Sequence, residues 1–82
     1  MQIKIFVEGI KNAERFSNIC QDYPYEMFLR SGDFCMDPKS MLGVLAIFYS
    51  AKGSVVVDIG EEMPEKDRLR FIKAISEYIR ED

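Results

Sequence analysis

The alternation of apolar and polar residues predicts four strands. A strand with one buried face carries an apolar residue at every second position, and Ile3, Ile5 and Val7 follow this rule. The β-branched run SVVVDI is typical of a well-buried central strand. The short turn SGD separates two further runs and predicts a hairpin. The predicted strands cover residues 2–8, 25–30, 34–36 and 54–59.

Three other segments repeat their apolar residues at helical spacing. We expect the first helix to begin at Asn12, because asparagine is a good N-cap. The second covers residues 39–49, since Asp37-Pro38 suits a helix start. The third begins near Pro64. The predicted apolar faces are Phe16, Ile19, Cys20 and Tyr23, then Val44, Ile47 and Phe48, then Leu69, Ile72, Ile75 and Ile79.

The order of these elements, βαββαβα, predicts an α+β fold. With short connections, the helices should pack on one face of a mostly antiparallel four-stranded sheet. The other face would be solvated. A chain of 82 residues is expected to form one domain, over residues 1–82, with one core. The residues expected to meet in that core are Phe16, Ile19, Val55, Val57, Ile72 and Ile75.

Composition and charge narrow the classes of partner. The net charge is -3, which disfavours nucleic acid and anionic membranes, because both bind basic surfaces. No apolar run approaches the roughly 20 residues that span a bilayer. The start of the chain alternates like a strand and lacks the apolar block of a signal peptide. We therefore expect a cytoplasmic protein.

Few side chains suggest catalysis or metal binding. The chain contains no histidine and no CxxC pair, so we expect neither a metal site nor a cofactor. Its two cysteines, Cys20 and Cys35, lie in apolar patterns and are expected to be small buried hydrophobes. No pair of carboxylates is marked by its spacing as acid and base. We expect that the protein is not an enzyme.

Residues 39–45 (KSMLGVL) combine a Lys-Ser pair, two large apolar residues, a glycine and an apolar pair. This segment resembles the one around the regulatory serine of the histidine-containing phosphocarrier (HPr) family of the phosphotransferase system. Residues 51–60 (AKGSVVVDIG) resemble the strand that follows it. The resemblance covers essentially the whole chain and is strongest over residues 36–60. It implies the family's fold, an open-faced β-sandwich with a four-stranded antiparallel sheet.

The residue that defines the family's chemistry is missing. Its carriers accept a phosphoryl group on a histidine at the start of the first helix, and that position corresponds here to Asn12, or alternatively to Lys11. The family's arginine and proline correspond to Glu14 and Arg15. Asparagine cannot accept the phosphoryl group, and Glu14 would repel it. We expect Asn12 to cap the helix N–H groups that hold the phosphate in a carrier.

Two further expectations follow from the resemblance. Ser40 corresponds to the regulatory serine, and it is either phosphorylated, as the helix dipole would favour, or structural in the first turn. Met41, Leu42 and Leu45 correspond to the family's apolar docking residues. Alternatively, a small core uses every apolar residue of this helix.

These observations lead to two main hypotheses. In the first, an HPr-like protein unable to carry phosphate on histidine acts as a regulatory or adaptor protein, and it binds a protein partner through the helix at 39–49. In the second, the chain is a small-molecule-sensing βαββαβ domain with glycine turns, at Gly9 and Gly53, beside a ligand at a dimer edge. A third hypothesis is a domain with no surviving partner. The identity of the partner and the oligomeric state are not predicted.

Overall fold

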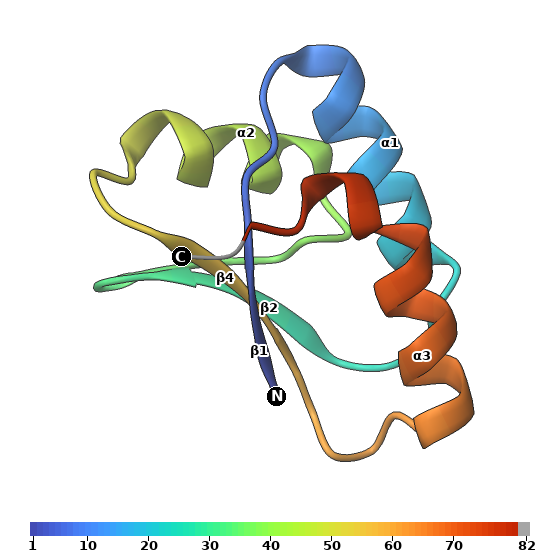
Figure 1. Cartoon of the computed structure of the whole chain (residues 1–82). Helices are drawn as coiled ribbons and strands as arrows, with labels where there is room; N and C mark the ends of the chain where they lie inside the picture. Colours follow the sequence, from blue (N-terminus) through green and yellow to red (C-terminus); the bar gives the residue numbers. More distant parts are fainter. Residues whose placement is uncertain (81–82) are drawn as a thin grey trace.

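The computed structural model describes residues 1–80, which form a four-stranded sheet and three α-helices in the order βαββαβα (Figure 1). The strands are β1 (Gln2–Ile5), β2 (Met27–Ser31), β3 (Phe34–Met36) and β4 (Val55–Ile59). The helices are α1 (Ile10–Gln21), α2 (Met41–Ser50) and α3 (Glu65–Ala74), and a short 3₁₀ helix, η1 (Ser76–Tyr78), follows. The strand order is β1-β4-β2-β3, with every neighbouring pair antiparallel. The predicted α+β fold is confirmed.

The three helices cover one face of the sheet and leave the other open (Figure 1). Alternation along the strands produces this arrangement: in β2, Met27 and Leu29 are buried beneath the helices, whereas Phe28 and Arg30 are exposed on the other face. β4 lies between β1 and β2 and buries every second residue. The prediction of a buried inner strand over 54–59 is therefore confirmed.

Four of the six predicted core residues are buried. Phe16, Val55, Val57 and Ile75 are members of the core, and Ile19 is half-buried against it. Ile72 is half-buried and is not part of this cluster. The helical partner of Ile75 in the core is Phe71, which is fully buried.

The predicted apolar face of the last helix is therefore wrong in part. Leu69 is 61% exposed, whereas Phe71, one helical position before Ile72, points into the core. Consecutive residues of an α-helix are about 100° apart around its axis, so the buried face is rotated from the predicted one by roughly that angle. The Phe71 ring meets the ring of Tyr23, from the end of α1, at a centroid distance of 5.2 Å.

The cysteines differ from each other, so the expectation that both are buried is wrong for one of them. Cys20 lies on the buried side of α1, and desolvation raises the pKa of its thiol to about 12. Cys35 is exposed on β3, the edge strand. It lies opposite Arg30 in the register of the sheet, and Arg30 is also exposed.

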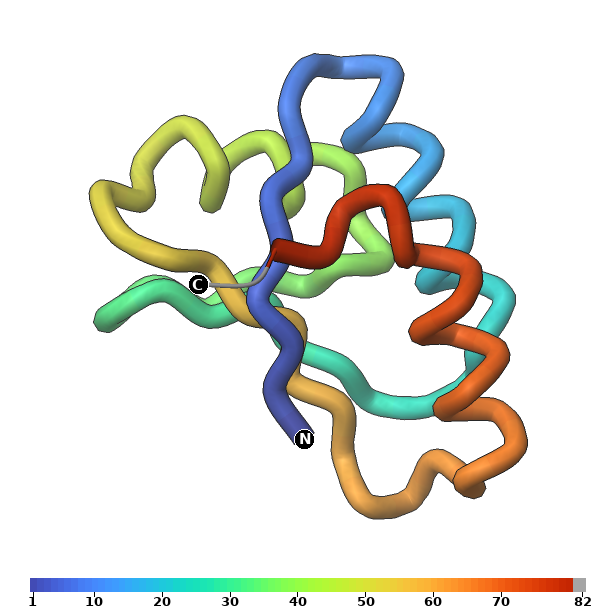
Figure 2. Tube along the Cα trace, viewed as in Figure 1, coloured from blue at the N-terminus to red at the C-terminus, as the bar shows by residue number. Residues whose placement is uncertain are grey.

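The end of the described chain lies along β1. Figure 2 shows the red segment after α3 reaching the blue segment at the start of the chain. Ile79 pairs with Ile5, the backbone N–H of Phe6 donates to the Tyr78 carbonyl at 2.8 Å, and that of Arg80 donates to the Lys4 carbonyl at 2.9 Å. This pairing fixes the backbone of Arg80 beside residues 4–6.

Candidate functional site

The N-cap of the first helix lies three residues earlier than predicted, so Asn12 is not the cap. The N-cap is Gly9, whose φ of 86° suits glycine, and its carbonyl accepts the N–H of Ala13 at 3.0 Å. Asn12 lies within the first turn. Its Nδ2 donates to the Glu8 carbonyl at 2.9 Å, and its Oδ1 accepts the hydroxyl of Tyr78 at 3.3 Å. Asn12 thus ties the start of α1 to η1.

The start of α1 carries two carboxylates as well as the exposed cations Lys11 and Arg15. Glu8 and Glu14 are both exposed there. Arg15 is exposed too, and its guanidinium forms a loose ion pair with Glu77 at 3.9 Å. An approaching phosphate would meet like charge from both glutamates. This surface is unlike a phosphoryl-acceptor site.

The second helix begins at Met41, two residues later than predicted. Asp37 does not cap it. Instead the Asp37 carboxylate accepts the backbone N–H of Lys39 at 2.9 Å and forms a local turn, as aspartate often does. Ser40 is the N-cap, and its Oγ accepts the N–H of Gly43 at 3.3 Å. Ser40 therefore has the structural role, while its exposed position at a helix start remains suited to a phosphate.

The turn before α2 is braced by α1. The Lys39 carbonyl accepts hydrogen bonds from Ser17 Oγ and from Gln21 Nε2, each at 2.9 Å. Gly43 packs closely on the same turn, because a Cβ there would lie 2.9 Å from the Asp37 carbonyl oxygen. The sequence analysis missed Ser17 and Gln21, whose partner lies 18 to 22 residues away.

The faces of α2 divide differently from the predicted docking set. Val44 and Ile47 are fully buried, as expected. Of the three predicted docking residues, Leu42 is 72% exposed, whereas Met41 and Leu45 are half-buried against the core. Tyr49, seven residues after Leu42 and thus on the same side, is 88% exposed.

Two exposed apolar side chains follow β1 along the chain: Phe6, directly after the strand, and Ile10, the first residue of α1. Together with Leu45, Phe48 and Tyr49 they line an open hollow of about 340 Å³. We call the exposed residues Leu42, Tyr49, Phe6 and Ile10 with the half-buried Leu45 the α2 face. The sequence analysis missed Phe6, Ile10 and Tyr49. A signal for Phe6 was present, because it is a large apolar residue on the polar side of the first strand.

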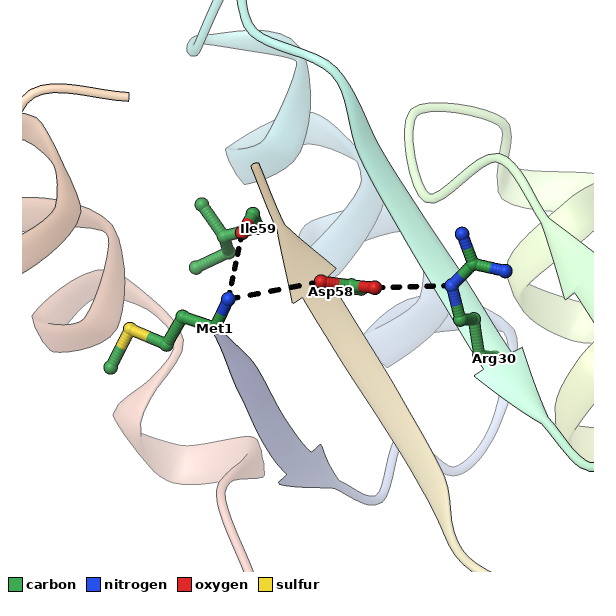
Figure 3. Close-up of polar contacts among 4 residues, drawn as sticks. All are labelled: Met1, Arg30, Asp58 and Ile59. Atoms are coloured by element: carbon green, nitrogen blue, oxygen red, sulfur yellow. Dashed lines mark hydrogen bonds and ion pairs between the residues drawn. The ribbon is translucent and has the colours of Figure 1, made fainter. Parts of the chain in front are cut away.

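The open face of the sheet carries a small charged cluster (Figure 3). The Asp58 carboxylate lies 3.1 Å from Arg30 Nε and 3.9 Å from the amino group of Met1. That amino group also donates to the Ile59 carbonyl at 3.0 Å. Exposed ion pairs of this kind contribute little, about 0–1 kcal/mol. We therefore interpret this cluster as structural, because it links the start of β1 to β4 and β4 to β2.

Other kinds of site find no support in residues 1–80. No group of three or more potential metal ligands gathers in this part of the chain. None of its helices is both long and apolar enough to cross a membrane.

Comparison with known proteins identifies no family for this chain. No protein-family model, curated protein or solved structure matches this chain. The resemblance of residues 39–45 to the phosphocarrier family therefore stays a prediction.

Proposed function

We propose that this chain is an HPr-like regulatory or adaptor protein of the cytoplasm, and that it binds a protein partner through the α2 face. The observation that carries the proposal is the exposure of Leu42 and Tyr49 on one side of α2, together with the hollow that Tyr49 lines with Phe6 and Ile10. These side chains come from two separate segments. The proposal does not include the carrying of phosphate on histidine.

The composition of α2 supports docking. No residue from Met41 to Ser50 is charged, although one side of the helix faces solvent. A surface helix normally carries polar and charged residues on that side. Contiguous exposed apolar surface in a folded protein commonly marks an interaction site. Aromatic side chains, which Tyr49 and Phe6 supply on the α2 face, are enriched in protein interfaces.

The start of α1 supports a regulatory role over a carrier role. The chain has no histidine, and the corresponding Asn12 uses its amide in contacts with Glu8 and Tyr78. Ser40 keeps a position at which a phosphate would be stabilised by the N-terminus of α2. Such a phosphate would lie two residues before Leu42 in the chain, so it would add negative charge near the start of α2.

The hypothesis of a small-molecule sensor has weaker support. Gly9 and Gly53 each line an open hollow. The positive φ of Gly9 already accounts for glycine at that position. A Cβ at either residue would meet no atom within 4 Å, so neither glycine is required by a close approach within the domain.

A substitution at Leu42 tests the proposal. We expect Leu42→Asp to abolish capture of the partner from an extract of the native cells and to change the free energy of unfolding by only about 0.5 kcal/mol, because the side chain is exposed. Leu69→Asp on α3 is a matched control, since Leu69 is similarly exposed. Equal capture by both variants, or unfolding of Leu42→Asp, would contradict the proposal.

A further inference from the structure

A second hollow adjoins the α2 face. It measures about 350 Å³, and its lining includes Lys4, Phe6, Phe48, Val55 and Arg80. Phe6 and Phe48 line both hollows and pack edge to face at a centroid distance of 6.0 Å. The two hollows therefore lie on either side of this aromatic pair, and a single bound segment can reach from one into the other.

The second hollow differs from the first in charge. The cation on which this contrast depends is Arg80, and no aspartate or glutamate of residues 1–80 lines this hollow. The whole chain has a net charge of -3, so this basic surface is contrary to the overall charge. The first hollow includes one charged residue, Glu8. The two adjoining hollows thus form one surface with a mainly apolar end and a basic end.

The Arg80 guanidinium is held in place by the fold. Its carbon lies 5.8 Å from the centroid of the Phe6 ring, a distance typical of a cation–π contact. Its Nη1 donates to the carbonyls of Glu77 and Ile79, each at 3.1 Å. A guanidinium positioned in this way loses little conformational entropy when it binds a carboxylate.

We propose, resting on the proposed function, that the partner binds as an extended peptide segment that places an apolar side chain on the α2 face and a carboxylate in the second hollow. Arg80 would donate charge-assisted hydrogen bonds to that carboxylate, which are stronger than neutral ones. Phe6 and Phe48 would contact the peptide between the two groups. The chemistry recognised is therefore that of an acidic, apolar peptide.

The probe is a library of random dodecapeptides displayed on phage, selected against the whole 82-residue chain. We expect enriched peptides to combine apolar residues with aspartate or glutamate. Resynthesised peptides should bind Arg80→Gln at least about ten-fold more weakly than wild type and lose affinity as salt concentration rises. Arg70→Gln, at an exposed arginine of α3, is the matched control and should bind like wild type.

A second variant guards against a folding defect in Arg80→Gln. Ser54→Asp places a carboxylate in the same hollow without removing an Arg80 contact, and it should also weaken binding by charge repulsion. Peptides that lose binding to Leu42→Asp but show no acidic preference, and bind both hollow variants normally, would overturn this inference and leave the proposed function standing. Peptides that ignore Leu42→Asp would overturn both.

Discussion

At the scale of single residues, the two cysteines have opposite environments. Cys20 is fully buried and its pKa is raised by desolvation, so its reactive thiolate is scarce, whereas Cys35 is exposed on an edge strand. We expect a thiol reagent at pH 8 to modify one cysteine in the native protein and two in denaturant, as counted by mass spectrometry. Cys35→Ser should abolish native labelling. Rapid labelling of Cys20 in the native protein would contradict the burial of its side chain on the inner side of α1.

The helix starts show what local sequence rules miss. Asn12 is a favourable cap by type, but the positive φ available to Gly9 begins α1 earlier, and the Tyr78 hydroxyl, 66 residues away, engages the Asn12 side chain. At α2 the sequence did not decide the role of Ser40, because Asp37 was a second candidate for the N-cap of the helix. That choice depends on a turn braced by Ser17, which no local pattern reveals.

At the scale of secondary-structure elements, α3 provides a direct test of packing. Phe71→Ala should lower the free energy of unfolding by about 3–5 kcal/mol, because it removes a fully buried ring. Ile72→Ala should cost about 1 kcal/mol or less, as expected for a residue outside the core. Chemical denaturation of the two variants measures both values. A larger loss for Ile72→Ala than for Phe71→Ala would restore the face predicted from the sequence.

The error in α3 has a physical origin. Ile75 belongs to two series of apolar residues at helical spacing, one with Ile72 and the other with Phe71. Periodicity alone cannot choose between them. The choice depends on tertiary packing: the Phe71 ring packs on Tyr23, just after α1, and the Tyr78 ring packs on Phe16 of α1. The strands were predictable because each needs only a period of two and one covered face.

At the scale of the whole molecule, the architecture was predictable but the candidate site was not. Element order and short connections were enough to predict helices on one face of an antiparallel sheet. The α2 face combines Leu42 and Tyr49 with Phe6 and Ile10, which are more than 30 positions away in the chain. Met41 belongs to the same sequence motif as Leu42 but packs against the core and is not part of this face. Only the tertiary structure separates these two residues.

The last prediction concerns phosphoryl transfer to the chain as a whole. The phosphotransfer enzyme that charges ordinary carriers of the HPr family delivers its phosphoryl group to a histidine, and none of the 82 residues is a histidine. At the start of α1, the exposed Glu8 and Glu14 also oppose an incoming phosphate by like charge. Incubation with that enzyme and labelled phosphoenolpyruvate should therefore leave the protein unlabelled. The variant Asn12→His should not restore full transfer, because both glutamates remain.

An ordinary carrier in the same reaction serves as the positive control. Stoichiometric, acid-labile label on the wild-type chain would show that phosphoryl transfer survives by another residue.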